Sequence, residues 1–184
     1  MKQIILPLAA LAAFLSAPAM AQGALPPAFH AGKAIPEFGK IATIDSDIPI
    51  PADTRFLVAF DVGKAAEGKI NRTLSSAARF INMHDEAGVA PANVRLAIVV
   101  HGSAVFDMAS DAAYARKYPA AKANPNAAII AALVDNGVQI IICGQSAAYH
   151  GVAKDQLLPG VKMSLSAMTA HAMLQQDGYT LNPF

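Results

Sequence analysis

Residues 94–100 read Val-Arg-Leu-Ala-Ile-Val-Val, and residues 138–143 read Val-Gln-Ile-Ile-Ile-Cys. Both runs are apolar almost throughout, which suits strands that are buried on both faces of a sheet. Two-sided burial is typical of parallel strands with helices packed above and below them. The sequence therefore predicts an α/β protein, a three-layer α/β/α sandwich with a mainly parallel sheet.

The segments around these two runs alternate between strand and helix patterns. Strands are also predicted at 55–61, at 161–165 and at 179–181, which makes about five in all. The helical pattern covers 71–87, a helix capped by Asn124-Pro125, a start at 146–150, and 166–177. The polar segment 103–122 fits either a helical insertion or a lid.

The N-terminus has the pattern of a cleaved secretory signal. Lys2 precedes an apolar run, and Ala19-Met20-Ala21 is a small-residue cleavage site. We predict a signal peptide over 1–21, a proline-rich arm over 22–54 and one domain over 55–184. The arm could lie over its own domain or over a neighbouring subunit. The expected location is the periplasm, with no membrane attachment of the mature chain.

Composition excludes several classes of function. The 184 residues carry 14 Lys+Arg and 13 Asp+Glu, and removal of residues 1–21 takes away Lys2 and leaves equal numbers. A neutral chain has no general attraction for nucleic acid, so no nucleic-acid partner is expected. A single cysteine excludes an intramolecular disulfide and a multi-cysteine metal site.

Common cofactor motifs are missing from the sequence. It contains no H-E-x-x-H zinc motif and no glycine-rich phosphate loop for a dinucleotide or a nucleoside triphosphate. We therefore expect neither a metal nor a cofactor.

The strand ends carry the residues with chemical potential. In a parallel sheet the ligand crevice lies beyond the carboxyl ends of the strands. One run ends at His101-Gly102 and another at Cys143-Gly144, so these residues are expected at one rim. Glycine there lets backbone or ligand approach closely.

Cys143 has two interpretations that stay open at this stage. A helix start after it would favour the thiolate, the nucleophilic form, with Gly144 and the following amides stabilising it. His101, Gln145 or His150 would then supply a proton or a hydrogen bond. The other interpretation is a small buried side chain that closes an apolar strand. An unpaired thiol is a liability in an oxidising compartment, which favours the functional interpretation.

A serine nucleophile is a further alternative. Residues 144–148 (Gly-Gln-Ser-Ala-Ala) resemble a G-x-S-x-G elbow, with Ala148 in place of the second glycine. Ser146 would need Asp155 or Asp177 together with His171, which lies inside a predicted helix. His84 also lies in a predicted helix, and neither histidine is expected to be a ligand.

The pattern around Cys143 resembles the DsrE/DsrF-like family of sulfur-relay proteins. The resemblance covers residues 55–184 and rests on a list of features: a strand ending in Cys143, Ser146-Ala147, Gly151-Val152, Leu157-Leu158-Pro159-Gly160-Val161, and a final helix leading to Gly178-Tyr179. It implies a compact α/β/α domain that forms oligomers, commonly trimers or hexamers. In the sulfur-transferring members a cysteine carries a persulfide, and here only Cys143 can occupy that position.

Two functional hypotheses follow. The first is an exported sulfur carrier, or a sulfurtransferase-like protein, that holds sulfane sulfur on Cys143 and exchanges it with a donor or acceptor protein or a small sulfane-sulfur compound. The second is a non-catalytic oligomeric binding protein in which Cys143 is structural.

Overall fold

The computed structural model describes residues 28–51 and 53–182, and its core is one five-stranded parallel sheet. The strands are β1 (Phe56–Val62), β2 (Val94–Val100), β3 (Gln139–Cys143), β4 (Val161–Ser164) and β5 (Thr180–Asn182). Their order across the sheet is β4-β3-β2-β1-β5, and every neighbouring pair is parallel. The predicted fold class is confirmed.

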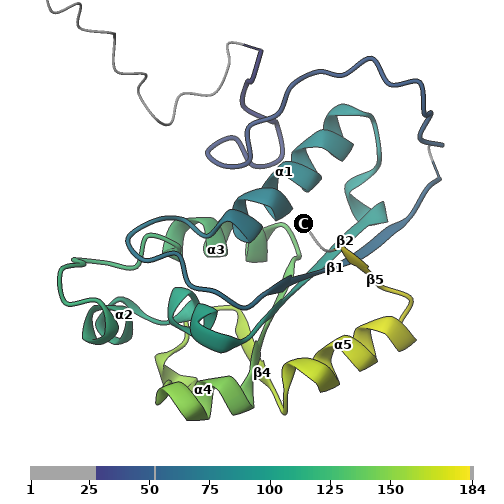
Figure 1. Cartoon of the computed structure of the whole chain (residues 1–184). Coiled ribbons are helices and arrows are strands. Elements are labelled where there is room, and N and C mark those ends of the chain that lie inside the picture. The colour runs from purple at the N-terminus through teal and green to yellow at the C-terminus, as the bar shows by residue number, and fades with distance from the viewer. Residues whose placement is uncertain (1–27, 52, 183–184) are drawn as a thin grey trace, which may run out of the picture.

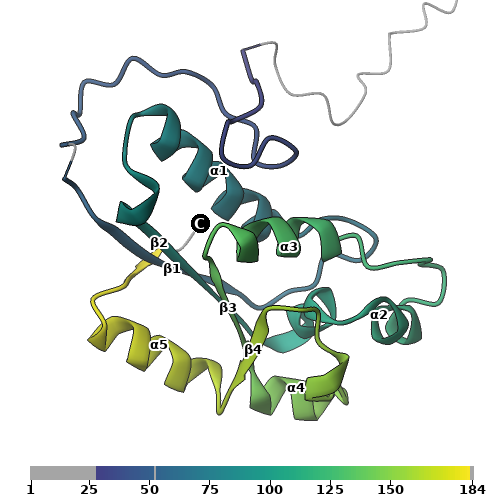
Figure 2. The same ribbon diagram turned by 180° about the vertical axis from the view of Figure 1, so that it is seen from behind.

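Helices cover both faces of the sheet. The long helices α1 (Arg72–Glu86) and α3 (Ala127–Asp135) lie on one face, and α5 (Ala167–Gln176) lies on the other (Figures 1 and 2). The short helix α4 (Gly144–His150) follows β3 directly at its carboxyl end. The core is larger on the α1 side, where alternate residues of β1 and β2 such as Phe60 and Ile98 are buried.

The segment after β2 is a helical insertion, one of the two predicted alternatives. It consists of a 3₁₀ helix (Gly102–Met108) followed by α2 (Asp111–Lys117). Residues 104–108 are all buried, so the first of these helices belongs to the core. Short 3₁₀ helices also occur at Pro91–Asn93 and Lys154–Gln156.

The predicted start of the third helix is wrong by two residues. Helix α3 begins at Ala127, with Asn126 at its N-cap. Asn124 lies before the turn that precedes the helix: its Oδ1 accepts from the N–H of Asn126, and its side-chain amide donates hydrogen bonds to the carbonyls of Asp107 and Ala109.

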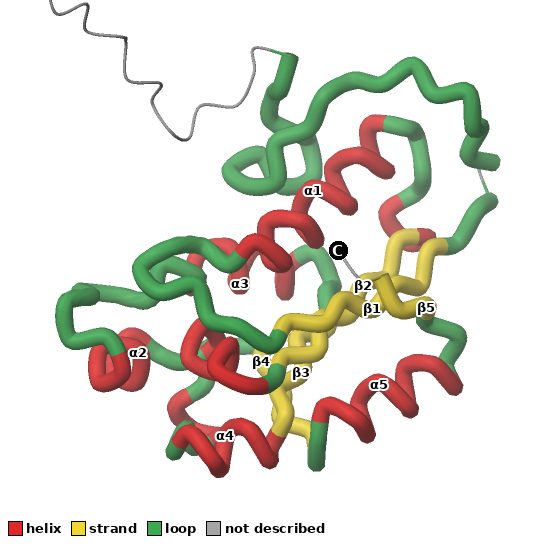
Figure 3. Tube along the Cα trace, viewed as in Figure 1, coloured by secondary structure: helices red, strands yellow, loops and turns green. Residues whose placement is uncertain are grey.

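The described part of the arm packs on α1 of its own domain. The buried Asn82 side chain accepts a hydrogen bond from the N–H of Ile35 and donates to the carbonyls of Ile35, Phe38 and Gly39. Figure 3 shows this loop running past α1 before the chain enters β1. Docking on its own domain is therefore established for residues 28–41.

The predicted signal peptide, residues 1–21, lies outside the described residues. Within 28–51 and 53–182, no helix combines the length and the apolar character needed to cross a bilayer.

Candidate functional site

A crevice of about 310 Å³ opens at the carboxyl edge of the sheet. It is lined by Asp61, His101, Cys143, Gln145, Ser146, Ser166, Ala167, Met168 and His171. These residues come from the ends of β1, β2 and β3 and from the first turns of α4 and α5. The predicted meeting of the strand ends is therefore observed.

Cys143 ends β3 and caps α4. Its sulfur accepts a hydrogen bond from the N–H of Ser146, with 3.5 Å between Sγ and N. Only 5% of the residue is exposed, and that part faces the crevice. The geometry places the sulfur where backbone N–H groups converge, which favours an anionic sulfur.

The pKa of the Cys143 thiol is lowered from its usual value. Burial opposes ionisation, but the hydroxyl and the N–H of Ser146 and the N–H groups of Ala167 and Gln145 outweigh it by hydrogen bonding to the sulfur. The donors come from the first turns of two different helices. The protein fold therefore favours the thiolate at this position.

A carboxylate flanked by two histidines also lines the crevice. Asp61 accepts a hydrogen bond from Nε2 of His101 at 2.9 Å and one from Nε2 of His171 at 2.8 Å. Burial alone would raise the pKa of Asp61, but its bonds to His171 and His101 lower it overall. Asp61 thus stays ionised and fixes both rings with Nε2 as the bonded atom.

The glycines at the strand ends have structural roles. Gly102 has a φ of +52°, and a Cβ there would lie 2.5 Å from the carbonyl oxygen of Gly63. Its N–H donates to the Ser146 hydroxyl oxygen at 3.0 Å. A Cβ on Gly144 would lie 2.6 Å from the Ser164 carbonyl oxygen. Both glycines permit the close backbone packing that builds the crevice.

Of the predicted supporting side chains, one does not reach the crevice. His101, Gln145 and Ser146 line it. His150 does not, because at the end of α4 its ring lies 5.2 Å from that of Phe106 and lines a separate hollow. The expectation that His150 returns to the crevice is wrong, since the short helix carries it to the far end.

Sequence reasoning missed Asp61 and His171. Asp61 could have been found from the sequence, because it lies at the carboxyl end of the apolar run of β1, just as His101 lies at the carboxyl end of β2. The sequence predicts His171 inside a helix and not as a ligand, but it lies one turn into α5 on the side that faces the crevice. His84 lies in a helix as predicted, where it is buried and hydrogen bonded to the Phe80 carbonyl.

The arrangement does not form a serine-hydrolase triad. The Ser146 hydroxyl oxygen accepts from Gly102, while His171 is bonded to Asp61 instead of to Ser146. Across the described part of the chain, no group of three or more His, Cys, Asp or Glu side chains is placed to hold a metal ion.

The family model described as "DsrE/DsrF-like family" matches residues 55–183, well over half of the chain. The chain belongs to the DsrE/DsrF-like family. This family is generally associated with sulfur relay. The match spans the whole α/β domain and the crevice with Cys143. No curated protein matches the chain with significant similarity.

Two solved structures are similar to this DsrE/DsrF-like protein. A protein of unknown function from Methanobacterium thermoautotrophicum, MTH1491, is 19% identical with a TM-score of 0.53, and the match covers 70% of this chain and 99% of that one. The ychN protein from E. coli is 15% identical with a TM-score of 0.49, and the match covers 70% and 100%. The first of these similarities supports the fold.

Proposed function

We propose that the protein is an exported sulfur carrier that holds sulfane sulfur as a persulfide on Cys143. The observation that carries the proposal is the position of the Cys143 sulfur, which lines the crevice and accepts hydrogen bonds from the first turns of two helices. A lowered thiol pKa increases the fraction of the nucleophilic thiolate at a given pH. Membership of a family associated with sulfur relay supports the same chemistry.

Sulfur transfer needs no external oxidant when the donor already carries sulfane sulfur. The Cys143 thiolate attacks the outer sulfur of a donor persulfide, R–S–SH, and an S–S bond forms as the donor's S–S bond breaks. The products are the Cys143 persulfide and the donor thiolate, R–S⁻. An acceptor thiolate reverses the step.

The two histidines of the crevice, His101 and His171, can assist this exchange. The leaving thiolate gains from a proton or a hydrogen bond, and His101 lines the same crevice as the cysteine. Asp61 holds His101 and His171 in fixed orientations. We assign Asp61 and His171 as positioning residues and His101 as the group that faces the exchanged sulfur.

The proposal includes location and assembly. Residues 1–21 have the pattern of a signal peptide, so the mature chain is proposed to start at Gln22 in the periplasm. Its partners would be a donor and an acceptor of sulfane sulfur, and the chain would act as a homo-oligomer.

Intact-protein mass spectrometry tests the proposal. The exported protein is purified under native conditions and incubated with a small persulfide such as glutathione persulfide. We expect a gain of one sulfur atom that a reductant removes and that Cys143→Ser abolishes. Ser166→Ala, a change at the same crevice, is the control that should retain loading. Absence of the added sulfur on the native protein would overturn the proposal.

The low exposure of Cys143 favours the second hypothesis, a binding protein in which the cysteine packs. That hypothesis predicts that alkylation of Cys143 requires unfolding, and that Cys143→Ala lowers stability by about 1 kcal/mol without affecting any sulfur-dependent function. Alkylation of the native protein at a rate close to that of a free thiol would contradict it.

A further inference from the structure

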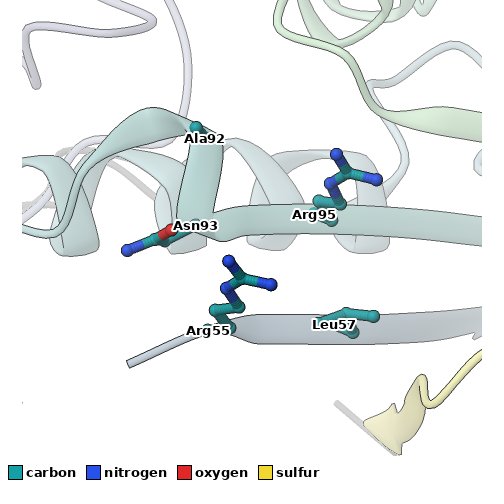
Figure 4. A pocket seen from close by; sticks show the side chains of 5 residues that line it. All are labelled: Arg55, Leu57, Ala92, Asn93 and Arg95. Carbon is teal, nitrogen blue, oxygen red and sulfur yellow. The ribbon is translucent and has the colours of Figure 1, made fainter. Parts of the chain in front are cut away.

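A second hollow, of about 340 Å³, lies at the opposite edge of the sheet. We call it the amino-edge groove, and it is lined by Arg55, Leu57, Ala92, Asn93 and Arg95. Figure 4 shows the two guanidinium groups extending from the starts of the neighbouring strands β1 and β2. Leu57 pairs with Arg95 across these strands and lies two residues after Arg55, so an apolar side chain lies beside the two cations (Figure 4).

The cations of the groove are unpaired in this chain. Arg55 and Arg95 are both exposed, and neither side chain forms an ion pair or a hydrogen bond with any residue in 28–51 or 53–182. Guanidinium groups pair well with carboxylates because they donate two parallel hydrogen bonds. The groove therefore offers two basic sites beside an apolar one.

The same chain exposes a segment with the matching chemistry. Residues 44–50 read Ile-Asp-Ser-Asp-Ile-Pro-Ile, and we call them the acidic strap. Ile44 is 73% exposed, Ile48 is 78% exposed, and both aspartates are exposed. Three exposed isoleucines in seven residues are a costly surface for a protein in water.

Within the described part of its own copy, the strap makes no side-chain hydrogen bond or ion pair to another element. The arm before it is anchored on α1, where the last side-chain contact is the hydrogen bond from Thr43 to Glu86. From there to Ile50 the described side-chain hydrogen bonds are local, between Ser46 and Ile48. No strap residue lines the groove.

We propose that the acidic strap of one copy docks in the amino-edge groove of a second copy of this chain. Asp45 and Asp47 would pair with Arg55 and Arg95, and the strap isoleucines would cover Leu57. Charge complementarity supports the choice of occupant, because the mature chain has no net charge and yet separates acidic and basic groups onto two unpartnered surfaces.

Docking within one copy is disfavoured by the chain path. Pro49 and Pro51 fix their own φ angles and hold the preceding residues extended. The N–H of Thr54 donates to the carbonyl of Pro51 just before Arg55, and with this link the strap residues do not line the groove of their own copy. A second copy meets the strap without any change in this link, and each copy offers one strap and one groove.

Sedimentation velocity of the full gene product, purified after export, tests this contact with charge reversals. The double variant Arg55→Glu/Arg95→Glu and the double variant Asp45→Arg/Asp47→Arg should each weaken self-association at least about tenfold. An equimolar mixture should recover association, because the native strap of the first variant meets the native groove of the second. Ile48→Ser should weaken association without any change of charge.

The control is Arg116→Glu/Lys122→Glu, which makes the same charge change on exposed residues of α2 and of the loop after it, neither of which lines the groove. It should associate like the native protein. Circular dichroism melts verify that every variant folds. A native protein that stays monomeric, or reversals that leave association unchanged, would overturn the proposal. So would a mixture that fails to recover association. Persulfide loading of Cys143 is measured separately, so failure here is distinct from failure of the sulfur-carrier proposal.

Discussion

Ser146 connects the thiol of the crevice to the backbone of the neighbouring strand end. Its N–H and hydroxyl lower the pKa of Cys143, and its hydroxyl oxygen accepts from Gly102. One residue thus stabilises the thiolate and joins α4 to the turn after β2.

Ser146→Ala should therefore raise the pKa of Cys143, since one hydrogen bond to the thiolate is lost. The midpoint of iodoacetamide alkylation, measured against pH, should move to higher pH. Stability should fall by about 1 kcal/mol because the Gly102 N–H loses its acceptor. Gln145→Ala is the control, because only the backbone N–H of Gln145 acts on the sulfur. An unchanged midpoint in Ser146→Ala would contradict this account.

Position 102 requires glycine for two reasons, the left-handed backbone conformation and the close approach of the Gly63 carbonyl. Gly102→Ala places a Cβ against the Gly63 carbonyl in a left-handed backbone conformation, which should cost about 1–3 kcal/mol. Gly68→Ala is a matched control, because Gly68 also has a positive φ, of +68°, but has open space around it. Urea unfolding should show the larger loss at Gly102. Equal losses would mean that the close contact with Gly63 is unimportant.

At the scale of elements, a buried polar cluster holds the loop between β1 and α1. Asp107 is fully buried in the 3₁₀ helix after β2, and its Oδ2 accepts from the N–H of Ala66 and the amide of Asn71. Its Oδ1 has no hydrogen-bond partner. Burial raises the pKa of this carboxyl more than the bonds from Asn71 and Ala66 lower it.

This cluster predicts a dependence of stability on pH. A carboxyl whose pKa is higher in the folded state is destabilising when ionised, so stability falls as pH rises from the unfolded pKa, near 3.8, through the folded pKa. The variant Asp107→Asn has no titrating group at this position. The free energy of unfolding of the native protein, relative to that of the variant, should therefore rise as pH falls. Urea unfolding across about pH 4–7 measures it. A difference that is constant over this range would refute the role of Asp107.

Asn82 makes more of the hydrogen bonds between the arm and α1 than any other described side chain of that helix. Asn82→Ala leaves the backbone groups of Ile35, Phe38 and Gly39 without partners, which should cost about 2–4 kcal/mol. Amide exchange at Ile35 should become faster. Arg79→Ala, which removes one exposed bond to the Lys40 carbonyl, should cost less than about 1 kcal/mol. Slow exchange at Ile35 in Asn82→Ala would show that the arm is held by other contacts.

At the scale of the whole molecule, the limits of sequence reasoning have physical causes. Buried parallel strands show in the sequence because two-sided burial demands apolar runs, so β2 and β3 could be placed. Because the carboxyl ends of parallel strands meet at one edge of the sheet, His101 and Cys143 could be predicted to lie at the same crevice. The strand pattern does not say which way a side chain on a helix points, and for that reason the place of His171 was missed and that of His150 was wrong. Asn82 could not be predicted, because its partners are backbone groups more than forty residues away.

The crevice and the groove lie at opposite edges of one sheet, and this separation is itself testable. Strand β2 spans seven residues, which is roughly 20 Å at about 3.3 Å per residue. Changes at sites this far apart with no shared partners usually act independently. Arg55→Glu/Arg95→Glu should therefore leave the pH profile of Cys143 alkylation unchanged, and Cys143→Ser should leave sedimentation unchanged. If charge reversal at the groove slowed alkylation in the crevice, assembly would control access to the thiol, because Leu57 packs on the same cluster as α5, the helix that lines the crevice.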